Sequence, residues 1–273
     1  MTKEFRVDLS DRVAVVTGAS RGAGRAIAAV LGRTGATVYV TGRSVRGGRA
    51  TEGRSGTIED TAELVSQRGG IGIAVRCDHT VDADVERLFE HVRRQRGRLD
   101  LLVNNAWGGY EQRGETDAPF FDAPFWQQPL WRWDAMFIAG VRAHFVAARL
   151  AVPLLLKQGG RPPKLIVSTI AWAFGAYLGN VLYDAAKAAT ARMAYGMAEE
   201  LHANEVAAVA VAPGHLGVTE SPEYLGRAVA TLAADPNVME KSGRLLTVGE
   251  LAREYGFTDI DGTQPEPFRV AIP

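Results

Sequence analysis

The sequence is poor in cysteine, in net charge and in long apolar runs, and each shortage excludes a class of protein. Its single cysteine, Cys77, cannot form an internal disulfide, which is typical of a protein from the reducing cytoplasm. Lysine plus arginine equals aspartate plus glutamate, 31 of each, so no global basic field attracts nucleic acid or an acidic membrane. No apolar run approaches the roughly 20 residues that span a bilayer, and residues 1–11 lack the apolar stretch of a signal peptide. We expect a cytoplasmic protein without nucleic-acid or membrane partners.

Metal-ligand patterns are also missing. The five histidines are scattered, and no histidine or cysteine pair has the spacing of metal ligands, so we expect no metal site. The chain does have 47% hydrophobic and 23% charged residues, the balance of a globular domain with a sizeable core.

Short apolar runs rich in β-branched residues alternate along the chain with longer stretches of helical periodicity. Strands are expected at 13–17, 37–41, 72–76, 99–103, 165–168 and 206–211, and helices between them at 21–34, 57–67, 82–96, 133–157 and 183–204. The strands are apolar nearly throughout, which indicates burial on both faces by helices and hence a parallel sheet. This alternation predicts one α/β domain over residues 1–273, a doubly wound parallel sheet of the Rossmann type flanked by helices.

A glycine-rich turn, Thr17-Gly18-Ala19-Ser20-Arg21-Gly22-Ala23-Gly24, follows the first expected strand and opens the first expected helix. In this context Gly18 permits a tight turn, and Gly22 lets the backbone approach a pyrophosphate at the helix N-terminus. Gly24 lets helix and strand pack closely. The turn predicts dinucleotide binding, with cofactor contacts at Gly18, Ser20, Arg21, Gly22, Ala23 and Gly24.

The spacing of these glycines resembles the short-chain dehydrogenase/reductase family, whose signature Thr-Gly-x-x-x-Gly-x-Gly is matched at every position. The resemblance covers residues 10–219, most of the chain. In that family an acid at the end of the second strand accompanies NAD, but here Gly42-Arg43-Ser44 holds none. A carboxylate would repel a 2′-phosphate, whereas Arg21 and Arg43 could bind one through charge-assisted hydrogen bonds. We therefore expect NADP rather than NAD.

Further cofactor contacts are implied by the same resemblance. Asp78 matches the aspartate that bonds the adenine amine, and Asn105 matches an asparagine of the Asn-Asn-Ala-Gly motif, in which Trp107 replaces the glycine. Pro213 and Gly214 match the pair beside the nicotinamide. The usual threonine downstream falls one position late, at Thr219, and receives no role.

Tyr183 and Lys187 carry the expected chemistry. Residues four apart on a helix share one face, so both side chains would point into the same cleft. A phenol has a pKa near 10, and a neighbouring ammonium lowers it toward the working range of a proton donor. The resemblance implies that Tyr183 passes the proton and that Lys187 also holds the nicotinamide ribose. The implied reaction is hydride transfer between NADP(H) and a carbonyl or secondary alcohol.

Two members of the family's catalytic set are displaced or missing. The position of the usual serine, 13 residues before Tyr183, holds Ile170, so Thr169 is the first choice to replace it and Ser168 the second. Neighbours in a strand face opposite sides, so only one of the two can serve. The usual helix asparagine is replaced by Gly140, which could leave room for a relay water. These departures place the chain on a divergent branch. They leave open a catalytically degenerate NADP-binding sensor or scaffold and, as a third alternative, an epimerase or dehydratase.

The remaining expectations concern loops and assembly. Residues 107–133 hold eight aromatic side chains, which either cover a hydrophobic substrate or pack against another subunit. Arg46, Arg49 and Arg54 are interpreted as belonging to a solvated loop, although they could add to phosphate binding. Residues 220–273, with helices at 222–234 and 247–255, depart from the family's last strand and are expected to cover the substrate cleft. The long helices 133–157 and 183–204 imply a homodimer or homotetramer.

Overall fold

A single parallel sheet forms the centre of the computed structural model, which describes residues 5–48, 55–109, 123–157, 164–171, 177–214 and 216–267. Within these residues the sheet has seven strands in the order β3-β2-β1-β4-β5-β6-β7. The strands are β1 (Val13–Val16), β2 (Thr37–Gly42), β3 (Ile71–Arg76), β4 (Leu101–Asn104), β5 (Lys164–Thr169), β6 (Val206–Ala212) and β7 (Leu245–Thr247). The predicted doubly wound α/β fold is confirmed.

The strand order places a switch point in the middle of the sheet. From β1 the chain runs outward to β2 and β3, then returns to place β4 on the other side of β1. The loops that leave the carboxyl ends of β1 and β4 therefore diverge and open a crevice between them, the place where sheets of this type bind ligands.

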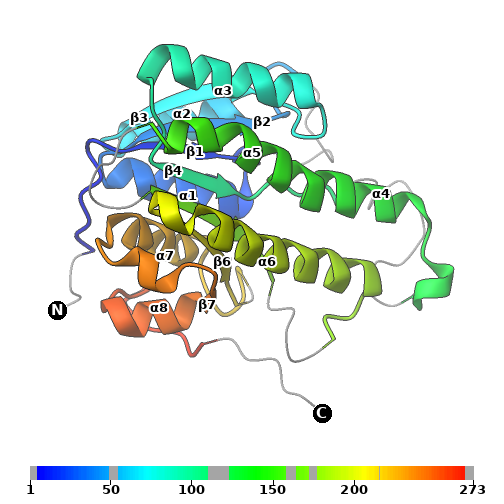
Figure 1. The fold of residues 1–273 in the computed structure, drawn as a ribbon. Coiled ribbons are helices and arrows are strands. Elements are labelled where there is room, and N and C mark those ends of the chain that lie inside the picture. Colours follow the sequence, from blue (N-terminus) through cyan, green and yellow to red (C-terminus); the bar gives the residue numbers. More distant parts are fainter. Residues whose placement is uncertain are drawn as a thin grey trace.

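Helices cover both faces of the sheet (Figure 1). One face carries α1 (Gly22–Arg33), α2 (Ile58–Gln67), α7 (Pro222–Ala234) and α8 (Val248–Tyr255), and the other carries α3 (Asp82–Arg96), α5 (Ala143–Leu155) and α6 (Val181–Leu201). Each layer closes its own apolar core, one around Ile27, Val38 and Leu225 and the other around Val15, Leu102 and Leu154. Short helical turns lie at η2 (Phe125–Gln127), η4 (His202–Asn204) and η5 (Val238–Lys241).

The structure corrects two expectations about the strands. The C-terminal region does contain a last strand, because β7 pairs in parallel with β6 over three residues. The strand is too short for its periodicity to stand out in the sequence. The second correction concerns β3, which is not buried on both faces. It lies at the sheet edge, and Ile71 is 49% exposed.

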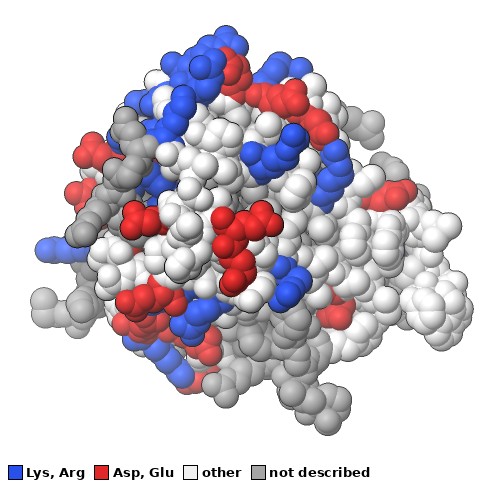
Figure 2. All heavy atoms as spheres, viewed as in Figure 1, with Lys and Arg blue, Asp and Glu red and all other residues white. Residues whose placement is uncertain are grey.

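The predicted helix at 133–157 begins earlier and is interrupted. It consists of α4 (Trp131–Phe137), a π-helical turn η3 (Ile138–Arg142) and α5. The stretch Trp131–Leu155 is long and apolar enough to cross a membrane, a property that it shares with core helices of soluble proteins. Its α5 part packs on β4 and β5, whereas α4 projects from the body of the molecule (Figure 1). The surface at the projecting end is largely uncharged (Figure 2).

Candidate active site

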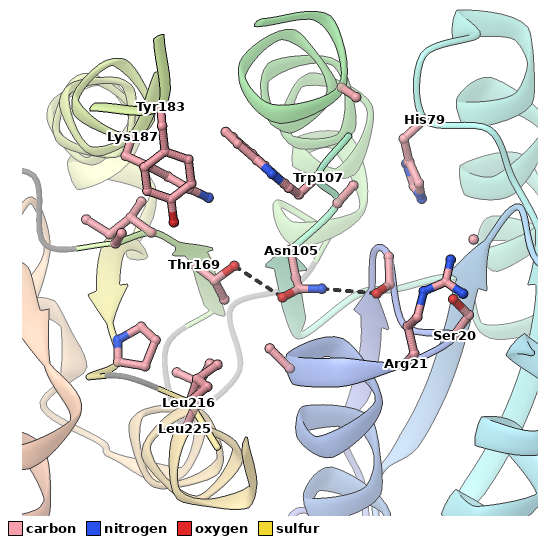
Figure 3. Close-up of a pocket in the computed structure, with 18 of the residues that line it drawn as sticks. Ser20, Arg21, His79, Asn105, Trp107, Thr169, Tyr183, Lys187, Leu216 and Leu225 are labelled. Atoms are coloured by element: carbon pink, nitrogen blue, oxygen red, sulfur yellow. Dashed lines mark hydrogen bonds between the residues drawn. The ribbon is translucent and has the colours of Figure 1, made fainter. Parts of the chain in front are cut away.

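One cleft of about 740 Å³ lies at the carboxyl edge of the sheet and contains most of the expected site residues. Its walls come from the segments that follow β1 to β6 and from α6 (Figure 3). Of the expected residues, Gly18, Ser20, Arg21, Ala23, Arg43, Asp78, Asn105, Thr169, Tyr183, Lys187, Pro213 and Gly214 line it. The fold therefore assembles, from segments far apart in the sequence, the residues singled out by their motifs.

The glycine-rich turn has the geometry that a dinucleotide requires. Gly18 has φ +64°, and a Cβ there would lie 2.9 Å from Cα of Ala106. A Cβ at Gly24 would lie 2.4 Å from the backbone oxygen of Gly18, so the turn and α1 pack without room for a side chain. Gly22 has φ +55° but faces open space, with nothing within 4 Å of a Cβ. The backbone at the start of α1 is thus bare on the side where a pyrophosphate would lie.

Asn105 joins the glycine-rich turn to the catalytic side of the cleft. Its Nδ2 donates to the backbone oxygens of Thr17 and Gly18, each at 3.1 Å. Its Oδ1 accepts from the hydroxyl of Thr169 at 3.3 Å (Figure 3). The backbone N–H groups of Asn105 and Ala106 both donate to the hydroxyl of Thr17, at 2.9 and 3.0 Å. This network holds the ends of β1, β4 and β5 in register around the floor of the cleft.

The far end of the cleft carries the basic residues that follow the first two strands. Arg21 Nη2 lies 3.4 Å from Oγ of Ser44, and Arg43 Nη1 lies 3.9 Å from Oδ2 of Asp78. Burial raises the pKa of Asp78, but hydrogen bonds from Thr80 and the charge of Arg43 outweigh burial and lower the pKa overall. An ionised Asp78 can accept from an adenine amine while it orients Arg43.

Arg46 does not contribute to that end of the cleft. It pairs at the surface with Asp60 at 2.7 Å and with Glu63 at 2.9 Å, which agrees with its interpretation as a solvated residue. Arg49 and Arg54 lie outside the described residues. Thr57 caps α2 in a capping box with Asp60, so this segment is fixed by local helix chemistry.

Tyr183 and Lys187 project from the first turns of α6 into the cleft, together with Thr169 from the end of β5 (Figure 3). Asn180 caps the helix by accepting from the backbone N–H groups of Leu182 and Tyr183, which fixes where the first turn begins. Ser168 is 1% exposed and faces away from the cleft, as alternation along a strand requires. Of the two candidate replacements for the family serine, only Thr169 lines the cleft that also holds Tyr183.

Lys187 lines the cleft and is partly buried. Burial lowers the pKa of its ammonium from 10.5 to about 7. Its Nζ lies 3.8 Å from the ring centroid of Trp107, and the Trp107 ring meets that of Tyr183 edge to face at 5.4 Å. The space beside Gly140, which the sequence suggested for a relay water, is filled by the indole of Trp107.

Two buried histidines near the cleft were not singled out from the sequence. His79 lines the cleft, with Nε2 2.8 Å from the hydroxyl of Thr41, and burial lowers its pKa to about 4. His144 on α5 donates from Nε2 to the backbone oxygen of Ala106 at 3.0 Å, and burial lowers its pKa to about 3. The position of His79 next to Asp78 was the one available signal, and nothing in the sequence marked His144.

Only the beginning of the C-terminal part reaches the cleft. The segment after Gly214 is pinned by Glu220, whose buried carboxylate accepts from the Gly214 N–H at 2.9 Å. Leu216, Val218 and Leu225 line the cleft, and none of the described residues beyond Leu225 does so. A covering role for the rest of 220–273 stays a prediction.

The aromatic residues of 107–133 separate into two groups. Trp107 turns into the cleft, whereas Phe125, Trp126 and Trp133 are 61%, 71% and 50% exposed near the projecting α4. Tyr110, Phe120 and Phe121 lie outside the described residues. The substrate-covering interpretation therefore fits Trp107, and packing against another subunit stays a prediction for the exposed group.

Known proteins resemble this chain over most of its length. The family described as short chain dehydrogenase matches residues 12–228. Dehydrogenase/reductase SDR family member 1 of Mus musculus is 36% identical over 93% of this chain and 85% of its own length, and its Homo sapiens counterpart is 34% identical with the same coverage.

Solved structures share the fold over nearly the whole chain. A protein from Xanthomonas campestris matches with a TM-score of 0.78 and 26% identity, covering 98% of each chain. A metagenomic short-chain oxidoreductase in complex with NADP has a TM-score of 0.66 and 28% identity, covering 83% of this chain and 92% of its own. The chain belongs to the short chain dehydrogenase family and is an oxidoreductase that acts on CH–OH or C=O groups.

Proposed function

We propose that this protein is an NADP-dependent oxidoreductase that interconverts a hydrophobic carbonyl compound and its secondary alcohol. One observation carries the proposal: a single cleft joins a bare glycine-rich turn to Tyr183, Lys187 and Thr169. When bound there, the nicotinamide supplies or accepts the hydride. The chain's own residues bind the substrate, exclude water and handle the proton.

Tyr183 is the proposed proton donor in the direction of reduction. Its hydroxyl gives a proton to the substrate oxygen as negative charge develops there. The positive charge of Lys187 favours loss of that proton. Thr169 is the proposed second donor: its hydroxyl, which donates to the Asn104 backbone oxygen and to Oδ1 of Asn105, each at 3.3 Å, would turn its hydrogen to the same substrate oxygen and orient the substrate. The apolar side chains that line the cleft favour a hydrophobic substrate. These side chains are Trp107, Ile170, Leu178, Leu216 and Val218.

The preference for NADP is proposed from the far end of the cleft. No acid follows β2, and Arg21, Arg43 and Ser44 line the cleft where a 2′-phosphate would lie. Two guanidinium groups and a hydroxyl are donors suited to a phosphate. The metagenomic short-chain oxidoreductase that was solved in complex with NADP is consistent with this preference. A cytoplasmic location and assembly as a homodimer or homotetramer remain part of the same proposal.

Turnover is tested by following NADPH oxidation with a panel of hydrophobic ketones and quinones. Replacing Tyr183 by Phe is expected to lower kcat by about 10²- to 10⁴-fold, because a general acid contributes about that much. Tyr195→Phe is the matched control, since Tyr195 lies on the same helix, is 39% exposed and does not line the cleft. Tight NADPH binding without turnover of any substrate would overturn the proposal in favour of a binding protein.

Cofactor choice is tested by measuring the dissociation constants of NADPH and NADH by fluorescence titration. Hydrogen bonds to charged groups contribute about 1.5–3 kcal/mol, so Arg43→Ala is expected to weaken NADPH binding about 10- to 100-fold. Binding of NADH should change little, because NADH lacks the 2′-phosphate. The exposed Arg46→Ala is the control. Equal or tighter binding of NADH by the unmodified protein would refute the assigned role of Arg43.

A further inference from the structure

The indole of Trp107 lies in a slot made by two glycines. A Cβ at Gly109 would lie 2.6 Å from Cζ2 of the indole, and a Cβ at Gly140 would lie 2.4 Å from Cζ3. Real Cβ atoms do not approach that closely, so both positions must lack a side chain for the ring to keep this place. Gly140 lies in the π-helical turn η3, the kind of local widening that is frequent at functional sites.

The slot presents the face of the indole to Lys187. Nζ of Lys187 lies 3.8 Å from the Trp107 ring centroid and 5.6 Å from that of Tyr183 (Figure 3). Tryptophan is the aromatic side chain that attracts a cation most strongly, and the attraction grows when the cation is desolvated. The edge-to-face contact with Tyr183 orients the indole from a third side.

Lys187 needs such a partner because its surroundings disfavour its charge. Burial is the cause that lowers its pKa to about 7, and no charged group of the described residues opposes that effect. The titratable side chains that face it are Tyr183 on its own helix and His144 on α5. His144 is neutral near pH 7, since burial lowers its pKa to about 3. The π face of Trp107 is therefore the contact that favours the ammonium.

We propose that Trp107 is a positioning residue that keeps the ammonium of Lys187 charged and aimed at Tyr183, on the site that the family gives to its helix asparagine. In this protein a fixed π face would stabilise and orient the charged lysine at that place, without itself carrying a proton. The value of Trp107 for the reaction rests on the proposed function, but its effect on Lys187 does not require turnover.

The test changes the electrostatics of the ring without changing its shape. Fluorotryptophans with one, two and three fluorines are introduced at position 107, because fluorine withdraws electron density from the π face. The pKa of Lys187 is measured in the cofactor-free protein by NMR of ¹³C-labelled lysine. The chain has five lysines, so Lys187→Arg identifies the signal by its loss.

The pKa of Lys187 is expected to fall stepwise, by about 0.5 to 1 unit with three fluorines. The same substitutions at Trp126, which is 71% exposed, should leave it unchanged. If Trp107 only fills space, its fluorination would not move the pKa, and a constant or rising value overturns the proposal. If turnover is found, the alkaline limb of the kcat/KM profile should move down by the same amount. A shift in the NMR titration without any turnover would leave this inference standing and refute the proposed function.

A second variant tests the slot. Gly140→Ala is expected to displace the indole and change both the near-UV circular dichroism and the Lys187 titration. Gly196→Ala on α6 is the matched control, because a Cβ there meets nothing within 4 Å. An unchanged Lys187 titration in folded Gly140→Ala protein would contradict the claim that the position of the Trp107 indole affects the pKa of Lys187.

Discussion

The hydroxyl of Thr17 is expected to be one of the most sensitive single groups for the stability of the cofactor cleft. It accepts from the backbone N–H of Asn105 at 2.9 Å and of Ala106 at 3.0 Å, and Thr17 is 1% exposed. Valine has nearly the same shape but no acceptor, so Thr17→Val would leave both N–H groups without this partner. A buried donor left unsatisfied costs about 1–3 kcal/mol. We expect a loss of about 3 kcal/mol in the free energy of unfolding.

Thr17→Ser is the matched control, because serine keeps the oxygen and loses one buried methyl group. Its expected cost is about 1 kcal/mol. Both variants would be compared with the unmodified protein by urea unfolding followed at 222 nm, without cofactor, since a ligand that binds the folded state adds stability. With a slope of about 1–3 kcal/mol per molar urea, the Thr17→Val midpoint should fall by about 1 M or more. A Thr17→Val variant as stable as Thr17→Ser would refute the argument that the two N–H groups depend on this hydroxyl.

Acid should destabilise the protein through His79 and His144, whose folded pKa values of about 4 and about 3 lie below the ordinary 6.5. The unfolded chain then binds protons that the folded chain does not, so the free energy of unfolding should fall as pH drops from 6.5 toward 4, by on the order of 1 kcal/mol per pH unit for each histidine. His144→Gln should flatten this slope in urea titrations while the exposed His202→Gln leaves it unchanged, and equal slopes would contradict the assignment. Gly72→Ala should lower Tm by several degrees, because its Cβ would lie 2.0 Å from a backbone oxygen of α2 and overpacking costs about 1–3 kcal/mol. Gly196→Ala is the comparison. An equal Tm for the two variants would contradict this prediction, because it would show that α2 can shift away from the added methyl group at little cost.

Local patterns were enough to predict the architecture and the cofactor turn. The strands around Val15, Val38 and Val209 are apolar on both faces, because helices cover both sides of the sheet. Each of these apolar runs therefore predicts a strand of a parallel sheet, even when the neighbouring strands are not known. Gly18, Gly22 and Gly24 are needed by one short segment, where a turn, a bare backbone and a close contact follow each other within seven residues. Tyr183 and Lys187 are one helical turn apart, so their shared direction also follows from the sequence.

Contacts between distant segments decided the rest. The sequence left Thr169 and Ser168 as alternatives, and the fold exposes only Thr169 to the cleft, so the catalytic role predicted for it is the one that remains to be tested. The short edge strand β7 depends on its pairing with β6. Its own three residues are too few to predict that pairing from the sequence.

The fold and the cofactor turn could be predicted from the order of residues alone, because each of these depends on the periodicity or spacing of residues that are neighbours along the chain. The partners of Lys187, in contrast, follow from contacts between segments that are far apart in the sequence. Gly140 suggested an empty place for water, whereas the fold puts there an indole from a position 33 residues earlier and seats it between two glycines. Packing of this kind is a property of three segments together, and no pattern within one of them records it.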